Sequence, residues 1–190
     1  MRINLENKNM NHLIEREIQI MKSVKHPNIV KMYDILKDST HIYIILEYCQ
    51  YGDFSKFLNN RPLKEEWAKS FLTQIAKALK YLKQKNIFHR DLKPHNILLT
   101  KKYKIKISDF GFAKFNNNNL SDTLCGSPLY MAPEILTYKK YTDKADLWSI
   151  GIMLYEMLTG TTPYKGISMY DLVNNIKNKS INVPDSIILT

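Results

Sequence analysis

Cysteine, arginine and long apolar runs are all scarce in this chain of 190 residues. Cys49 and Cys125 are far apart and lack the CxxC spacing of a zinc site, so we expect neither a zinc site nor a disulfide framework. The longest apolar runs, such as residues 42–46, have strand length and are far shorter than the roughly 20 residues of a membrane span. The N-terminus also lacks the apolar region of a signal peptide. We therefore expect a soluble, intracellular and cytoplasmic protein without a membrane partner.

Acidic residues are also in short supply, because 18 of them face 28 basic residues and give a net charge of +10. The only arginines are Arg2, Arg16, Arg61 and Arg90, and the lysines are scattered along the chain. A dispersed basic excess without interleaved exposed aromatics is typical of a solvated surface. We therefore expect no nucleic-acid partner. The alternative, a basic protein that binds nucleic acid, predicts steeply salt-dependent binding, and only the net charge favours it.

The apolar pattern predicts an α+β fold in two parts. Residues 13–24 have helical periodicity, and two strand-like runs that follow predict a hairpin. Beyond residues 47–52 the pattern becomes mainly helical. One helix is predicted to bury a single face, marked by Trp67, Phe71, Ile75, Leu79 and Leu82. A later helix, within residues 141–160, is apolar on nearly every side and ends at Gly160.

Polar side chains gather between two apolar runs in the stretch NIFHRDLKPHNILL, residues 86–99. It brings together Arg90, Asp91, Lys93 and Asn96. An unpaired polar group away from water costs about 2 to 7 kcal/mol, so stability alone would not select this cluster. The triplet DFG follows Asp91 by eighteen residues, and APE ends the next loop at Glu134. Each motif alone is weak, whereas their joint order and spacing are specific.

Taken together, these motifs resemble those of the eukaryotic-type protein kinases over nearly the whole chain. The segments DFGFAK, TLCGSPLYMAPE and KADLWSIG are most similar to the autophagy-initiating serine/threonine kinases. The resemblance implies a partial, two-lobe kinase domain over residues 1–190. Residues 1–48 would form a partial N-lobe with helix C and short antiparallel strands. Residues 49–190 would form a mostly helical C-lobe that lacks its last helices.

The same resemblance implies transfer of the γ-phosphoryl group of ATP to serine or threonine in a protein substrate. Catalysis of this reaction rests mainly on positioning and electrostatic stabilisation. Asp91 would accept the proton of the substrate hydroxyl, and Lys93 would lie near the transferred group. Asn96 and Asp109 would supply oxygen ligands, which suit Mg²⁺. The expected cofactors are thus ATP and Mg²⁺.

For the nucleotide, the resemblance places Leu46 at the gatekeeper position of a hinge. Backbone groups of Glu47 and Cys49 would bind adenine, Leu98 would form the floor of the pocket, and Asp53 would contact the ribose. Glu17 matches the helical glutamate that pairs with a phosphate-holding lysine.

Four further positions carry family roles by resemblance. Thr123 falls at the activation-loop phosphosite, and Arg90 would pair with its phosphate. His95 stands where arginine-directed kinases tend to carry an acidic residue, so we expect no strong preference for basic substrates. His89 would pack in a hydrophobic spine with Met21, Met32 and Phe110. Asp146 would bind backbone groups of the loop around Asp91.

The glycine-rich loop and strand lysine of the family would fall at or before Met1, and Glu134 lacks its usual arginine partner. Two kinase interpretations follow. The sequence is a truncated or misassigned reading frame of a gene whose full product is an active enzyme, or it is an inactive kinase remnant that acts as a binding module. For the chain as printed we expect weak Mg²⁺-ATP binding and nearly absent transfer. Losing one well-placed electrostatic donor commonly costs about 10² to 10³ in rate. The oligomeric state is left open.

Overall fold

The computed structural model describes residues 2–4, 8–115, 127–139 and 142–184, with side chains from residue 14 onward except 114 and 115. Its strands are β1 (Arg2–Asn4), β2 (Met32–Lys37), β3 (His41–Leu46), β4 (Ile87–Phe88), β5 (Ile97–Leu99), β6 (Ile105–Ile107) and β7 (Lys114–Phe115). The α-helices are α1 (Lys8–Ser23), α2 (Phe54–Leu58), α3 (Glu65–Gln84), α4 (Pro133–Leu136), α5 (Lys144–Thr159) and α6 (Met169–Asn178). Two 3-10 turns are η1 (Pro94–Asn96) and η2 (Pro128–Tyr130). Thr123 and Cys125 lie outside the described residues.

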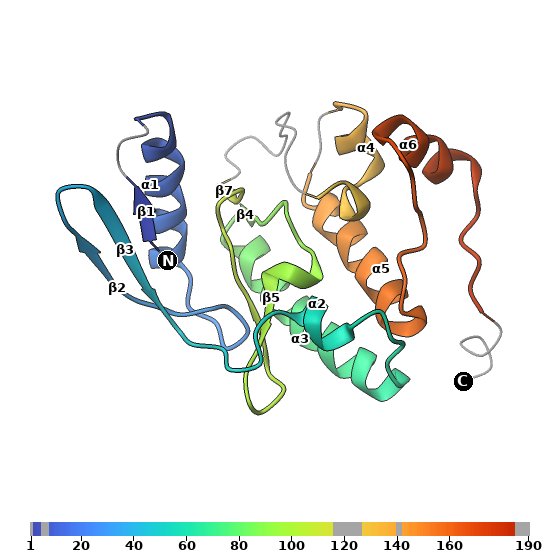
Figure 1. The fold of residues 1–190 in the computed structure, drawn as a ribbon, viewed down its shortest axis with the longest axis horizontal. Helices are drawn as coiled ribbons and strands as arrows, with labels where there is room; N and C mark the ends of the chain where they lie inside the picture. The colour runs from blue at the N-terminus through green and yellow to red at the C-terminus, as the bar shows by residue number, and fades with distance from the viewer. Residues whose placement is uncertain (1, 5–7, 116–126, 140–141, 185–190) are drawn as a thin grey trace.

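The N-terminal part is an antiparallel sheet of order β1-β3-β2, with α1 beside it (Figure 1). The predicted hairpin of β2 and β3 forms, with Ile35 opposite Ile44. Ile44 is buried, as are Ile20 and Met21 on α1, so one face of the sheet is covered by the helix. The strand β1 was not predicted, because three residues are too short to show a period-two pattern. Its pairing with β3 leaves β2 at the sheet edge.

The C-terminal part is built around α3 and α5, as the apolar pattern predicts. Phe71 and Ile75 of α3 are fully buried, and Met153 and Met157 of α5 join the same core. Gly160 ends α5 with φ of 80°, a left-handed conformation that glycine adopts without steric cost.

Two details of these helices differ from the prediction. Trp67 was expected on the buried face of α3, but its side chain is 42% exposed because it lies at the first turn and packs edge-on against Tyr103. On α5, Leu147 is 58% exposed, so this helix is not covered on every side in the described part of the chain.

Two short antiparallel strand pairs lie between the sheet and the large helices, and the second of them is a hairpin (Figure 1). In the first, β4 pairs with β7, and in the second β5 pairs with β6. A bridge between Ile29 and Ile107 joins this hairpin to the N-terminal part, and one between Asp53 and Leu98 joins it to the start of α2. These two strand pairs therefore place the loops around Asp91 and Asp109 at the junction of the two parts.

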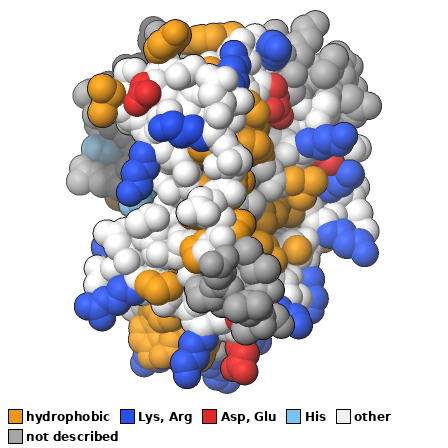
Figure 2. All heavy atoms as spheres, turned by 90° about the vertical axis from the view of Figure 1, so that its right-hand side faces the viewer, with side chains coloured by type: hydrophobic (Ala, Val, Ile, Leu, Met, Phe, Trp, Pro, Cys, Tyr) orange, Lys and Arg blue, Asp and Glu red, His pale blue; other side chains and the backbone are white. Residues whose placement is uncertain are grey.

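The surface carries its basic excess in a dispersed form. Figure 2 shows one face on which lysine and arginine side chains are spread out, around apolar groups that run down the middle of the view. This distribution agrees with a solvated basic surface. No helix within the described ranges has both the length and the apolar character that crossing a bilayer requires.

Candidate active site

The loop of residues 89–96, which includes η1 and joins β4 to β5, is held in place by α5. The carboxylate of Asp146 accepts hydrogen bonds from the N–H groups of His89 and Arg90, both at 2.9 Å. Burial raises the pKa of Asp146, against the opposing effect of His89, Arg90 and these two hydrogen bonds. The predicted partners of Asp146 are therefore confirmed, and this loop is anchored from the core of the helical part.

Asp91 lies at the centre of the polar groups in this loop. The amide Nδ2 of Asn96 donates to the carbonyl oxygen of Asp91 at 2.8 Å and to its Oδ2 at 2.9 Å. The ammonium Nζ of Lys93 lies 2.8 Å from the same Oδ2. Since Asn96 uses its side-chain amide nitrogen here, its side-chain oxygen Oδ1 is left to accept a hydrogen bond or to coordinate a metal. The short spacing of these residues thus produces a shared cluster with a buried carboxylate.

Ser127 joins this cluster and was not singled out from the sequence. Its hydroxyl donates to Oδ1 of Asp91 at 3.2 Å and accepts from Nζ of Lys93 at 2.6 Å. It comes from the segment before η2, 36 residues after Asp91. The only signal was its place in the motif TLCGSPLYMAPE, which shows a resemblance and carries no contact. Ser127 fixes Lys93 and Asp91 relative to each other.

Asp109 is brought beside Asn96 by backbone contacts. The N–H and hydroxyl of Ser108 both donate to the carbonyl oxygen of Asn96, at 2.9 and 3.0 Å. Asp109 itself has φ of 63°, and its Oδ1 accepts the N–H of Gly111 at 3.2 Å. Such left-handed residues cluster at functional sites, where the surrounding structure maintains them. Arg90, with φ of 69°, is a second example in this site.

The pair Asn96 and Asp109 fits a magnesium ion that is bound together with phosphates. In the described part of the chain, no group of three His, Cys, Asp or Glu side chains could enclose a metal by itself. Mg²⁺ is usually held by one or two protein oxygens, while water and substrate phosphates complete its octahedron. Two neighbouring oxygen donors are therefore suitable for this ion.

His89 and Phe110 pack as expected for a spine. Their rings meet edge to face with centroids 5.1 Å apart, and Nε2 of His89 lies 3.0 Å from the carbonyl oxygen of Ser108. Met21 belongs to the same buried cluster, and Met32 packs against it. The imidazole is fully buried, which supports a structural role.

Glu17 points from α1 toward the Asp109 region and is only 9% exposed. Burial, followed by the charge of Asp109, raises the pKa of Glu17 to about 7, and a hydrogen bond from the Phe110 backbone opposes this shift in part. None of the described side chains forms an ion pair with Glu17. The predicted lysine partner is thus not among them.

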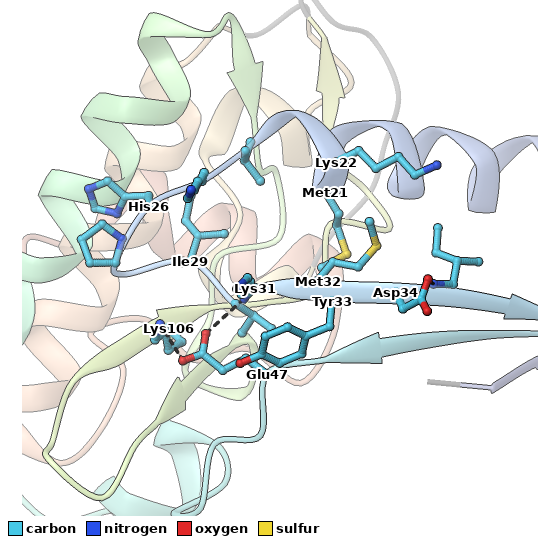
Figure 3. A pocket seen from close by; sticks show the side chains of 15 residues that line it. Met21, Lys22, His26, Ile29, Lys31, Met32, Tyr33, Asp34, Glu47 and Lys106 are labelled. Carbon is cyan, nitrogen blue, oxygen red and sulfur yellow. Dashed lines mark hydrogen bonds and ion pairs between the residues drawn. The ribbon is translucent and has the colours of Figure 1, made fainter.

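The Glu47 side chain, in the hinge after β3, is bound by β6 and by the segment before β2. Its Oε1 lies 2.7 Å from Nζ of Lys106, and its Oε2 accepts the N–H of Lys31 at 3.1 Å (Figure 3). The N–H of Glu47 donates to the Lys31 carbonyl at 2.8 Å, and the Cys49 carbonyl accepts from Gly52. Within the described residues, the Glu47 carbonyl and the Cys49 N–H have no hydrogen-bond partner. These are the two backbone groups that adenine would need.

Leu98 and Asp53 lie next to each other across an antiparallel bridge. Leu98 is half-buried, between the fully buried Ile97 and Leu99, and suits the floor of a pocket. Asp53 caps α2: its Oδ1 accepts the N–H of Lys56 at 3.0 Å, and its Oδ2 pairs with the Lys56 ammonium at 3.1 Å. A ribose contact by Asp53 would compete with this capping role.

The large pocket in Figure 3 lies behind the hinge, outside this constellation. It has a volume of about 940 Å³ and is lined by the end of α1, the segment into β2, Glu47 and Lys106. Asp91, Asn96 and Asp109 do not line it. Its size therefore has no bearing on the chemistry of the Asp91 cluster.

Known proteins match the chain along most of its length. The family model described as the protein kinase domain matches residues 1–187. Serine/threonine-protein kinase atg1 of Dictyostelium discoideum is 52% identical over 190 residues, which cover 96% of this chain and 28% of that protein. ATG1c of Arabidopsis thaliana is 44% identical, with 90% of this chain and 24% of that protein covered. Human ULK1 is 45% identical, with 84% and 16% covered.

The chain thus spans about a quarter or less of the length of these relatives. Within that span the family match runs through the sheet, the hinge and the helical part, whereas a chance motif would match one loop. Because the match includes the loops that hold Asp91, Asn96 and Asp109 together, the chain belongs to the protein kinase family.

Proposed function

We propose that this chain is part of the catalytic domain of a serine/threonine kinase that transfers the γ-phosphoryl group of ATP to protein substrates. The carrying observation is the cluster in which Lys93, Asn96 and Ser127 all contact the Asp91 carboxylate. Three contacts on one carboxylate fix its orientation, which is what a reaction that depends on positioning requires.

Each residue of the cluster has one task in this proposal. The Asp91 carboxylate accepts a hydrogen bond from the substrate hydroxyl and aims its oxygen at the phosphoryl group. Lys93 brings positive charge to the transferred oxygens, and Ser127 keeps its ammonium in place. Asn96 and Asp109 hold Mg²⁺, which, when bound, neutralises charge on the phosphates. The Glu47 carbonyl and the Cys49 N–H bind the adenine ring, above Leu98.

The choice of serine and threonine over tyrosine rests on Lys93, two residues after Asp91, and on the names of the relatives. Those relatives are called serine/threonine-protein kinases. The motifs shared with them favour a role in the autophagy-initiating branch. His95, at an exposed position after Lys93, leaves us expecting no strong preference for basic substrates.

Regulation of this domain is proposed to act through Thr123 and Arg90. Arg90 is part of the 89–96 loop, and Asp146 binds its backbone N–H. Its Nε donates to the Phe112 carbonyl at 2.6 Å. A guanidinium in this position can bind a phosphate on the segment that follows Phe112. Thr123 itself lies outside the described residues.

The test measures phosphate transfer from ATP to a generic serine/threonine substrate. Two polypeptides are compared: residues 1–190, and the same residues preceded by a kinase-type glycine-rich loop and lysine strand. We expect transfer from the extended polypeptide and almost none from residues 1–190. The blank is Asp91→Asn in each, because this change keeps the shape of the side chain and removes its charge.

The results separate the two kinase interpretations. Transfer by the extended polypeptide that disappears in Asp91→Asn supports the proposed function. An extended polypeptide that folds, binds ATP and transfers no faster than its Asp91→Asn blank would overturn it in favour of an inactive binding module. The complete set of Asp91, Lys93, Asn96 and Asp109 argues against that alternative.

A further inference from the structure

A second concave surface lies on the side of α3, at the turn between β5 and β6. We call it the turn pocket; it has a volume of about 420 Å³. Residues from α3, from the β5–β6 turn and from the segment before β2 line it, among them Trp67, Gln74, Lys77, Lys102, Tyr103 and Lys104. None of these residues belongs to the Asp91 cluster, and the proposed function assigns them no role.

Two exposed aromatic rings, those of Trp67 and Tyr103, line this pocket, and the ring of Tyr51 lies next to it. The rings of Trp67 and Tyr103 are 5.2 Å apart, and Tyr51 lies 5.5 Å from Tyr103. Trp67 is 42% exposed, Tyr103 is 40% exposed and Tyr51 is 46% exposed. Large aromatic residues that remain exposed side by side are typical of interaction surfaces.

Tyr103 occupies its position at a conformational cost. Its φ is 52°, in the left-handed region, which is uncommon for a bulky residue. The turn is closed by hydrogen bonds from the Tyr103 N–H to the Thr100 carbonyl and from the Thr100 N–H to the Lys104 carbonyl, both 3.0 Å. Glycine or asparagine would suit this backbone better. The fold therefore presents an aromatic ring where turn chemistry alone would favour a small residue.

The floor of the turn pocket is preformed. Gln74 Oε1 accepts hydrogen bonds from Asn28 Nδ2 and from the Ile105 N–H, both at 3.1 Å. Asn28 Nδ2 also donates to the Ile105 carbonyl at 3.1 Å. This network ties α3 to the two neighbouring segments, so a ligand would meet a fixed surface.

The charged side chains that line the turn pocket are all positive within the described residues. Lys77, Lys102 and Lys104 line it, all exposed, and no described Asp or Glu does. The larger pocket of Figure 3 differs, since Glu47 and Asp34 share its lining with lysines and Glu47 pairs with Lys106. We propose that the turn pocket binds an acidic peptide segment of a partner protein, with an aromatic or aliphatic anchor against the exposed surfaces of Trp67 and Tyr103 and carboxylates on the lysines.

The geometry favours a peptide over single-stranded nucleic acid. Tyr103 meets Trp67 at 68° and Phe57 at 61°, so these rings meet edge to face and do not form parallel platforms for stacked bases. Glu65 and Glu66 also lie in the first turn of α3, next to Trp67, where they repel any anionic group. A nucleic acid carries such a group at every nucleotide, whereas a peptide can be uncharged at this end. An apolar anchor at that end and carboxylates at the lysine end match both features.

Binding is tested by fluorescence anisotropy with the 190-residue chain and a labelled peptide in which a Phe-Leu pair lies at one end and Glu residues fill the other. The double variant Lys102→Glu/Lys104→Glu should weaken binding at least about tenfold, because it replaces attraction by repulsion. The matched control is Lys22→Glu/Lys25→Glu, which makes the same charge change in the pocket of Figure 3 and should stay within about twofold. Equal losses in the two variants would show attraction by net charge alone and overturn the proposal.

Tyr103→Asn tests the aromatic part, because asparagine fits the left-handed backbone and removes the ring. We expect weaker binding without a lower unfolding midpoint. A peptide whose Phe-Leu pair is replaced by Ser-Gly should also bind more weakly to the parent. Unchanged affinity in both comparisons overturns the anchor and with it the proposal.

Two further measurements complete the test. The peptide should change the tryptophan fluorescence of the parent, and Trp67→Phe should abolish this change, although Trp148 remains. A single-stranded RNA that binds more tightly than the peptide, and loses affinity in Lys102→Glu/Lys104→Glu, would assign the pocket to nucleic acid and overturn the peptide proposal. Since no ATP or phosphate transfer is involved, failure here leaves the proposed kinase function unaffected.

Discussion

Asp146 shows how a single residue far along the sequence from Asp91 controls the conformation of the 89–96 loop. Its carboxylate is the acceptor for two buried backbone N–H groups. In Asp146→Ala both donors lose their partner, at about 1 to 3 kcal/mol each, so we expect the free energy of unfolding to fall by roughly 2 to 6 kcal/mol. Urea denaturation measures this loss.

The neighbouring Asp143 provides the control for Asp146. Its carboxylate lies 2.6 Å from the Lys83 ammonium. The Lys83 side chain is 71% exposed, so this is a surface ion pair. Surface ion pairs contribute about 0 to 1 kcal/mol, so Asp143→Ala should have a small effect. Similar losses in the two variants would contradict the anchoring role of Asp146.

Thr123 carries the residue-scale prediction on regulation. If its phosphate pairs with Arg90, phosphorylation orders the segment after Asp109 through charge-assisted hydrogen bonds. In an active, extended form of the domain, Thr123→Ala should therefore lower the transfer rate far more than Ser121→Ala. The measurement is the initial rate after treatment with ATP, with phosphorylation sites mapped in parallel. Equal rates for Thr123→Ala and the parent would rule out this mechanism.

At the scale of elements, two glycines of α5 should respond in opposite ways to the same substitution. A Cβ on Gly160 would lie 2.8 Å from the Asn60 carbonyl oxygen, and φ is 80° there, so Gly160→Ala should destabilise the protein by more than about 1 kcal/mol. Gly151 is inside the helix, and a Cβ there meets nothing within 4 Å. Gly151→Ala should stabilise it by about 0.5 to 1 kcal/mol. Thermal denaturation of the two variants decides whether the signs differ.

The β2–β3 hairpin should become sensitive to acid through Asp38. Hydrogen bonds from the backbone N–H groups of Thr40 and His41, with the Tyr43 hydroxyl, lower the pKa of Asp38 to about 2. Because the folded value lies below the ordinary 3.8, the carboxylate stabilises the turn above pH 3.8 and loses this effect as the pH falls through 2.

Amide hydrogen exchange of β2 and β3, corrected for intrinsic rates, measures this effect. Protection should decrease over that pH range in the parent, and Asp38→Ala should lose protection at neutral pH as well. Glu66→Ala, on α3, is the control. Unchanged exchange of the hairpin in Asp38→Ala at neutral pH would show that the strand pairing needs no support from this turn.

For the whole molecule, we expect the net charge of +10 to lower the free energy of unfolding. Its basic side chains are spread out over the face in Figure 2, and most have no acidic partner among the described ion pairs. Like charges on a compact surface repel, and salt screens this repulsion over a Debye length of about 10 Å at 0.1 M. Sodium chloride should thus raise the urea midpoint of unfolding. A midpoint that falls with salt would mean that ion pairs outweigh repulsion.

Much of the fold and of the site was predictable because it depends on short-range patterns. Helical periodicity located α1, α3 and α5, since apolar residues three and four apart share one face. Asp91, Lys93 and Asn96 lie within one short loop, so their spacing already brought them together. The kinase motifs indicated the fold because each is a short local string and their joint order and spacing are specific, although none is specific alone.

Tertiary structure alone decided which distant segments complete these local units. Ser127 reaches Asp91 across 36 residues, a contact that no periodicity encodes, whereas the family resemblance had already assigned Asp146 to the loop around Asp91. A periodic pattern shows which face of a helix is apolar, and the segment that covers this face is chosen by packing. Trp67 was placed in the core for that reason, whereas its actual neighbour is the exposed Tyr103, held in a left-handed turn that only the assembled hairpin and α3 bring alongside it.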